Sequence, residues 1–117
     1  MKILRLYTDR KGETHFEEIE IPLKPSLGNS WNASRRLPGK GLILGESTLQ
    51  HDVDWELAPR RQYLVNLDTP VEITASDGET RLIALGDIVL MEDTTGKGHI
   101  SRAQTRRARR SIFIPIE

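Results

Sequence analysis

The sequence predicts an all-β domain, and three observations lead to that prediction. Short segments rich in Ile, Leu and Val alternate apolar and polar residues, which is the period of a half-buried strand. Turn residues interrupt these segments about every ten residues, as they do in β-sandwiches and barrels. No segment keeps a helical period over more than two turns. At 117 residues the chain has the length of a single domain with one core, spanning residues 1–117.

The first half of the chain should supply three strands and one long loop. Residues 2–7 are rich in Ile, Leu and Tyr, and residues 16–23 alternate Ile and Leu with Glu until Pro22 ends the strand. Residues 24–40 hold too many prolines, glycines and asparagines for a regular element. Trp31 in this loop is expected either to anchor it on the core or to cover a pocket and contact substrate. Residues 41–49 should form the third strand.

The second half should be a series of strands joined by turns. Residues 63–67 continue the segment that begins at Trp55. Residues 71–74 and 80–85 flank Ser76-Asp77-Gly78, and Asp-Gly between two strand patterns is a strong hairpin signal. Gly86-Asp87 turns the chain into a strand over residues 88–91. Residues 99–101 and 111–115 should be the last strands.

Composition limits the classes of function. The 17 basic and 17 acidic residues balance, so no protein-wide field would recruit nucleic acid. The arginine-rich residues 106–110 are either a phosphate or anion contact or a solvated connection before the last strand, and the second is expected. No apolar run approaches the roughly 18 residues of a membrane span, and the first residues lack the apolar segment of a signal peptide, so we expect a cytoplasmic protein without membrane contact. The absence of cysteine excludes disulfides and thiolate metal sites.

The segment from Trp55 to Tyr63 is expected to form the wall of a site. It places charged and amide groups on a chain otherwise built like a core strand. In an extended chain Glu56, Ala58, Arg60 and Gln62 share one face, unless Pro59 shifts the alternation by one residue. Arg61 and Tyr63 fall on the opposite face, where we expect packing or pairing at a subunit interface.

The three histidines differ in what their positions suggest. His99 follows Gly96-Lys97-Gly98 in a glycine-rich turn and is expected to meet Glu56 and Gln62 in space. His51 lies near Glu56 in the sequence and is a reserve ligand only, because five extended residues can separate the two by well over ~15 Å. His15 precedes a strand pattern and is expected to be exposed.

Five motifs follow one another along nearly the whole chain: Ala58-Pro59-Arg60-Arg61-Gln62-Tyr63, Val71-Glu72-Ile73, Gly86-Asp87, Glu92-Asp93-Thr94-Thr95-Gly96-Lys97-Gly98-His99 and Phe113-Ile114-Pro115. In this order they resemble a small single-domain branch of the cupin superfamily. The resemblance implies a double-stranded β-helix, which is a jelly-roll barrel with the site inside it. It also implies a homodimer, the common state of the family.

The same resemblance implies a metal site. Cupins usually bind Mn, Fe, Ni, Zn or Cu through histidines and one glutamate. On that pattern Glu56 takes the place of the first histidine, Ala58 that of the second and Gln62 that of the glutamate, while His99 matches the histidine of the second motif. Glu56, Gln62 and His99 are thus the ligands that the resemblance implies for a divalent metal, which would polarise a substrate carbonyl or generate a hydroxide.

Two alternatives need no metal. A carboxylate enclosed by apolar side chains has a raised pKa suited to proton abstraction, so Glu56 is a candidate general base. His99 would then donate to a developing oxyanion, with Gln62 hydrogen-bonding it and Arg60 holding an anionic group, as in an isomerase, lyase or eliminase acting beside a carbonyl. In the second alternative the same residues bind a small ligand without turning it over. The leading expectation is an enzyme that acts on a small polar or carbonyl-bearing molecule.

Overall fold

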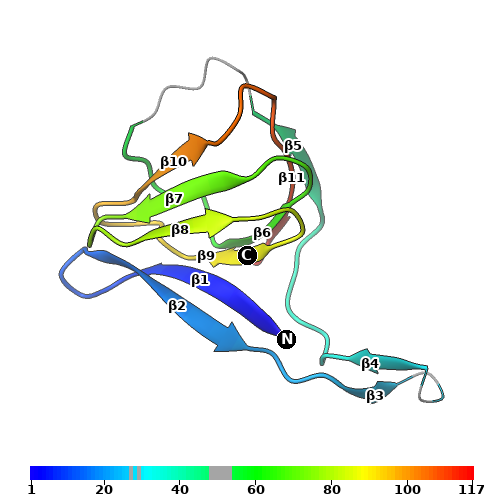
Figure 1. The fold of residues 1–117 in the computed structure, drawn as a ribbon. Helices are drawn as coiled ribbons and strands as arrows, with labels where there is room; N and C mark the ends of the chain where they lie inside the picture. Colours follow the sequence, from blue (N-terminus) through cyan, green and yellow to red (C-terminus); the bar gives the residue numbers. More distant parts are fainter. Residues whose placement is uncertain (27, 29, 48–53) are drawn as a thin grey trace.

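The computed structural model describes residues 1–26, 28, 30–47 and 54–117, and over these residues the chain is all-β, as predicted (Figure 1). No helix occurs in the described residues, and accordingly none of them forms a helix that could cross a membrane. The strands of this part of the chain are β1 (Lys2–Thr8), β2 (Thr14–Glu20), β3 (Lys24–Ser26), β4 (Trp31–Ala33), β5 (Ile43–Glu46), β6 (Gln62–Asn66), β7 (Val71–Ala75), β8 (Thr80–Ile83), β9 (Ile88–Met91), β10 (His99–Ala103) and β11 (Arg110–Pro115).

Two sheets form the body of the molecule. The larger has the strand order β2-β1-β9-β6-β11-β5, and the smaller has the order β10-β7-β8. β1 and β9 pair in parallel, and the other neighbours pair antiparallel. Strands that are far apart in the sequence are therefore adjacent in the large sheet. The result is a two-layer, sandwich-like arrangement with one apolar interior.

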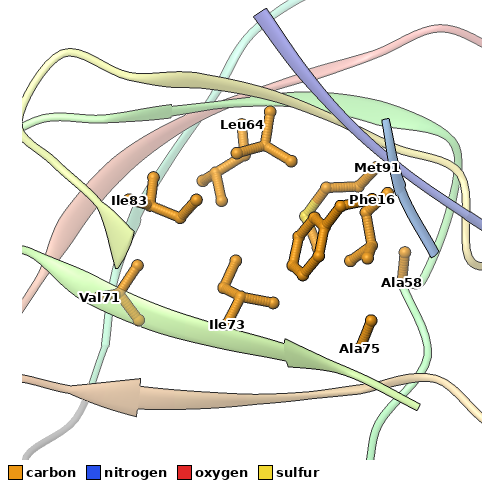
Figure 2. Packing of buried hydrophobic residues seen from close by; sticks show 10 residues of the cluster. Phe16, Ala58, Leu64, Val71, Ile73, Ala75, Ile83 and Met91 are labelled. Carbon is orange, nitrogen blue, oxygen red and sulfur yellow. The ribbon is translucent and has the colours of Figure 1, made fainter. Parts of the chain in front are cut away.

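The core lies between the two sheets because alternate residues of each strand face inward. Leu64 on β6, Val71 and Ile73 on β7, and Ile83 on β8 are buried and belong to one apolar cluster. Figure 2 shows Val71 and Ile73 in the interior below Leu64 of the large sheet, with Ile83 from the neighbouring strand β8 and with Phe16 in the same cluster. Burying a side chain of this size stabilises the fold by about 1.5–3 kcal/mol. This packing fixes the walls of the site described below.

The structure corrects the prediction of a long irregular loop over residues 24–40. β3 and β4 form a small hairpin in this region, which extends away from the two larger sheets (Figure 1). Pro25 lacks an N–H donor but is tolerated there, because a two-stranded ribbon has only edge strands. Trp31 on β4 is 68% exposed, so it does not anchor the segment on the core. The predicted strand over residues 41–49 is shorter, since β5 spans Ile43–Glu46, and His51 lies outside the described residues.

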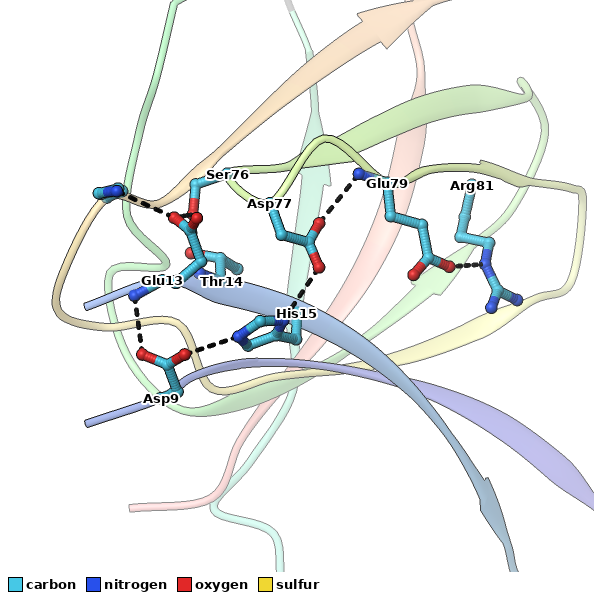
Figure 3. A network of polar contacts seen from close by, with 9 residues as sticks. Asp9, Glu13, Thr14, His15, Ser76, Asp77, Glu79 and Arg81 are labelled. Atoms are coloured by element: carbon cyan, nitrogen blue, oxygen red, sulfur yellow. Dashed lines mark hydrogen bonds and ion pairs between the residues drawn. The ribbon is translucent and has the colours of Figure 1, made fainter. Parts of the chain in front are cut away.

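The sequence suggested that His15 would be exposed. In the structure its side chain is only 30% exposed, and two carboxylates hold it. Its Nε2 lies 2.7 Å from Asp9 Oδ2 and its Nδ1 lies 2.9 Å from Asp77 Oδ2. Asp9 belongs to the turn between β1 and β2, and Asp77 to the turn between β7 and β8 (Figure 3). The hydrogen bond to Asp9, reinforced by Asp77, raises the pKa of His15 above its ordinary value. The histidine thus joins the ends of two hairpins from different sheets.

This contact predicts a pH-dependent contribution to stability. Because the pKa of His15 is raised in the folded chain, the stabilisation is complete below its ordinary pKa of 6.5 and is lost as the pH rises through the raised value. The pKa of Asp9 is lowered, mainly by its hydrogen bond to His15, so on the acid side the stabilisation is lost as the pH falls through that lowered value. His15→Gln should lower Tm by roughly 2–5 °C near pH 5.5 and by much less at pH 9. Thermal unfolding of both proteins across this range checks the prediction, and an equal loss at both pH values would contradict it.

Candidate functional site

A cavity of about 320 Å³ opens between the two sheets. Glu56, Arg60, Gln62 and His99 all line it, so the structure brings together four of the residues that the sequence analysis singled out. Its apolar wall comes from both layers and includes Leu64, Ile73, Met91 and Phe113. The volume is at the small end of the range of about 300–1,000 Å³ found for ligand sites, so the cavity suits a small molecule.

A single β-bridge places Glu56 beside His99. The Glu56 amide donates to the His99 carbonyl at 2.9 Å, and the His99 amide donates to the Glu56 carbonyl at 2.9 Å. The chain reaches this bridge through Gly98, whose φ of +77° lies in the left-handed region that glycine adopts without strain. Gly98 also packs directly on the Glu56 backbone, where an added Cβ would overlap the carbonyl oxygen and lie 2.8 Å from the carbonyl carbon. A glycine is thus required for the two site residues to meet.

His99 is buried and held from behind by Asp93. The ring Nδ1 lies 2.5 Å from Asp93 Oδ2, and the two side chains are 4% and 0% exposed. Asp93 follows β9, and its carbonyl accepts a hydrogen bond from the Ala58 amide at 3.1 Å. No role for Asp93 was predicted from the sequence, although an acidic residue shortly after a buried apolar strand was an available signal. Asp93 fixes the orientation of the imidazole, so that Nε2 remains for the cavity.

The second nitrogen of His99 is directed toward Glu56. His99 Nε2 lies 3.9 Å from Glu56 Oε1, which is within range of an ion pair but longer than a hydrogen bond. The Glu56 side chain is 46% exposed, so it stands where the cavity meets solvent instead of being enclosed by apolar side chains as expected. The site therefore combines a buried, fixed imidazole with a carboxylate that is open to water.

The cavity also carries two guanidinium groups. Arg60 donates from its Nη1 to Gln62 Oε1 at 2.9 Å, which joins two of the predicted residues. Arg109 lines the same cavity, although the sequence analysis assigned the arginines of residues 106–110 to a solvated connection. Burial lowers the pKa of the Arg109 guanidinium, and the negative charge of Glu56 partly offsets this effect. The predicted strand over residues 111–115 gave no signal that Arg109, two residues before it, would turn inward.

The metal ligands implied by the cupin resemblance do not form a good site for a divalent ion. The only imidazole among the three is that of His99, and the amide oxygen of Gln62 already accepts a hydrogen bond from a guanidinium. Arg60 and Arg109 would place two positive charges in the same cavity as the cation. Among the described residues there is also no group of three or more His, Asp or Glu side chains arranged to hold a metal. The chemistry of these donors favours an anion in the cavity over a cation.

Three other predicted residues lie away from the cavity. Arg61 Nε and Nη2 donate to Glu92 Oε2 at 2.8 and 2.6 Å, and Arg61 also pairs with Glu117. Tyr63 lies in a separate groove against Ile3 and Ile114. Both residues lie away from the cavity, as the alternation predicted, although residues 57–61 form no strand and β6 begins only at Gln62. Arg61 finds its partners within the chain. Trp31 is not among the residues that line the cavity.

The chain was compared with models of protein families and with curated proteins. Neither comparison gives a match, so the function has to be inferred from the residues of the cavity.

Proposed function

We propose that the protein is a cupin-like, metal-free acid–base enzyme that moves a proton at a carbon next to a carbonyl group. The two facing sheets agree with a double-stranded β-helix, the barrel implied by the sequence motifs. One observation carries the proposal. His99 is buried, its Nδ1 lies 2.5 Å from Asp93 Oδ2, and it lines a small cavity together with Glu56, whose Oε1 is 3.9 Å from His99 Nε2.

The histidine is the proposed base. An ionised Asp93 accepts the Nδ1 proton, which leaves the Nε2 lone pair directed into the cavity. When Nε2 removes the proton from carbon, the electron pair of the C–H bond forms a C=C bond and the carbonyl oxygen takes the negative charge. When the proton on Nε2 first trades with water, delivery of a solvent proton to the same carbon gives exchange, and delivery to the enolate oxygen gives the enol tautomer. The step needs no reactant other than water.

Neighbouring residues complete this assignment. Arg60 keeps further N–H donors besides the one bound to Gln62, and these can stabilise the developing oxyanion. Glu56, half-exposed and 3.9 Å from His99 Nε2, is placed to pass the proton between the imidazole and water. The apolar wall holds the carbon chain of the substrate. This differs from the sequence-based hypothesis, in which Glu56 was the base and His99 the donor.

The experiment is proton exchange in D2O, followed by NMR, with a panel of short 2-oxo and 3-oxo acids and the corresponding neutral ketones. The protein is first treated with a chelator to remove metal ions. We expect it still to catalyse exchange, seen as loss of the NMR signal of the proton next to the carbonyl. General-base catalysis contributes about 10²–10⁴-fold, so His99→Gln should lose a factor of this size. His15→Gln is the matched control, since His15 lies between two hairpin turns outside the cavity.

Three results would contradict the proposal. Exchange that persists in His99→Gln would remove the base, and exchange that disappears with the chelator and returns with Mn, Fe, Ni, Cu or Zn would make the site metal-dependent. Binding of the panel compounds without exchange would make the protein a ligand-binding barrel.

A further inference from the structure

Arg109 is the residue of the cavity that acid–base chemistry alone does not explain. Its backbone is fixed on both sides, because the Arg109 amide donates to Ser47 Oγ at 2.9 Å and the Ser47 amide donates to the Arg109 carbonyl at 2.8 Å. Its side chain lines the cavity with Glu56 and His99. The next residue behaves differently: Arg110 is 65% exposed and pairs with Asp68 at 2.6 Å. The fold therefore directs one arginine of the pair inward and leaves the other at the surface.

The inward position is costly unless a counter-charge is supplied. Removing a guanidinium from water is unfavourable, and the lowered pKa of Arg109 reflects that cost. Within the described parts of the chain the Arg109 side chain makes no hydrogen bond, and its charge is balanced only in part by Glu56. Among the described residues that line the cavity, Arg60 and Arg109 carry guanidinium groups and Glu56 carries a carboxylate, while the Asp93 carboxylate behind them is hydrogen-bonded to His99. An anionic ligand in the cavity would give Arg109 a direct partner.

The remaining wall limits what can carry that charge. Leu64, Ile73, Met91 and Phe113 give the cavity an apolar part, while its charged residues come from the segments around Glu56 and Arg109. A ligand that fits both parts has a short apolar chain and one anionic group. Guanidinium groups bind carboxylates through paired, charge-assisted hydrogen bonds.

We propose that the cavity binds a small monocarboxylic acid whose carboxylate is held by Arg109, with Arg60 as a second contact. Binding of the acid follows from the charges and shape of the cavity alone. That the acid is also the substrate rests on the proposed function, in which His99 acts on a carbonyl compound. The substrate class is then a short oxo acid, with its apolar chain against the sheet residues and its carbonyl near His99.

The test uses butanoate as the probe and butanamide as its neutral counterpart, with protein amide chemical shifts measured by NMR titration. We expect butanoate to bind at least about tenfold more tightly than butanamide, since a charge-assisted contact contributes roughly a tenfold factor or more. Arg109→Gln should remove this preference, and Arg60→Gln should reduce it. Arg110→Gln is the matched control and should leave binding within about twofold of the unchanged protein, a difference too small to indicate a lost contact.

Two results would overturn the inference. Equal binding of butanoate and butanamide to the unchanged protein would show that the cavity does not select an anion, whatever the variants do. Unchanged butanoate binding in Arg109→Gln would show that Arg109 is not the contact. The proposed function can fail on its own. If the unchanged protein exchanges no proton of any acid, and both it and His99→Gln bind butanoate, the anion site stands and the catalysis is removed. If neutral ketones and oxo acids exchange equally, and Arg109→Gln does not slow either, the catalysis stands and the anion site is removed.

Discussion

Replacing Asp93 by asparagine is expected to reverse the tautomer of His99 and to lower the rate of proton exchange by about 10²–10⁴-fold. Asp93 Oδ2 lies 2.5 Å from His99 Nδ1, and both side chains are buried. In the proposed mechanism Asp93 is an ionised carboxylate, which can only accept a hydrogen bond, so Nδ1 carries the proton and Nε2 acts as the base. The asparagine amide would donate to Nδ1 instead, which puts the proton on Nε2, where it blocks catalysis.

The tautomer can be observed independently of activity. ¹⁵N shifts of the His99 ring should indicate protonated Nδ1 in the unchanged protein and protonated Nε2 in Asp93→Asn. Asp93 Oδ1 has no hydrogen-bond partner among the described residues, so the substitution leaves the number of bonds at that atom unchanged. His15→Gln again serves as the control and should change neither the ring shifts of His99 nor exchange. If Asp93→Asn kept both the original tautomer and the rate, Asp93 would be only a packing residue.

Replacing Gly98 by alanine should have the largest effect on stability. Its φ of +77° already costs an L-residue about 1–2 kcal/mol, and the added Cβ would collide with the Glu56 carbonyl. Overpacking of this kind adds about 1–3 kcal/mol. We therefore expect Gly98→Ala to lower the free energy of unfolding by about 2–5 kcal/mol, measured by urea denaturation. Exchange activity should fall as well, because the bridge that joins Glu56 to His99 has to open.

Gly86 offers a matched control for the backbone effect. Its φ is +81°, and among the described residues no atom beyond Gly86 and its two chain neighbours lies within 4 Å of the position that a Cβ would occupy. Gly86→Ala should therefore show only the conformational cost of about 1–2 kcal/mol and should leave exchange unchanged. Equal losses of stability in the two variants would mean that the contact with Glu56 contributes nothing.

Much of the fold could be predicted because its signals are local. Strict alternation marks β7, and Asp77-Gly78 marks the hairpin between β7 and β8, where Gly78 has a φ of +97°. The hairpin of β3 and β4 could not be predicted in the same way. Its strands have three residues each, too short to show a period, and Pro25, Gly28 and the two asparagines of the segment give it the composition of a loop.

By itself, the sequence determined that the chain forms short strands, and it singled out Glu56, Arg60, Gln62 and His99, which line one cavity in the structure. Charged and amide side chains on a strand-like segment, and a histidine after a glycine turn, are properties of contiguous residues. Only the tertiary structure decided that Asp93 lies behind His99, that Arg109 turns into the cavity and that Trp31 stays out of it. These positions depend on which strands pair and on what each loop packs against. Burial and charge balance at a site are sums over residues that are distant in the chain, and no local pattern encodes them.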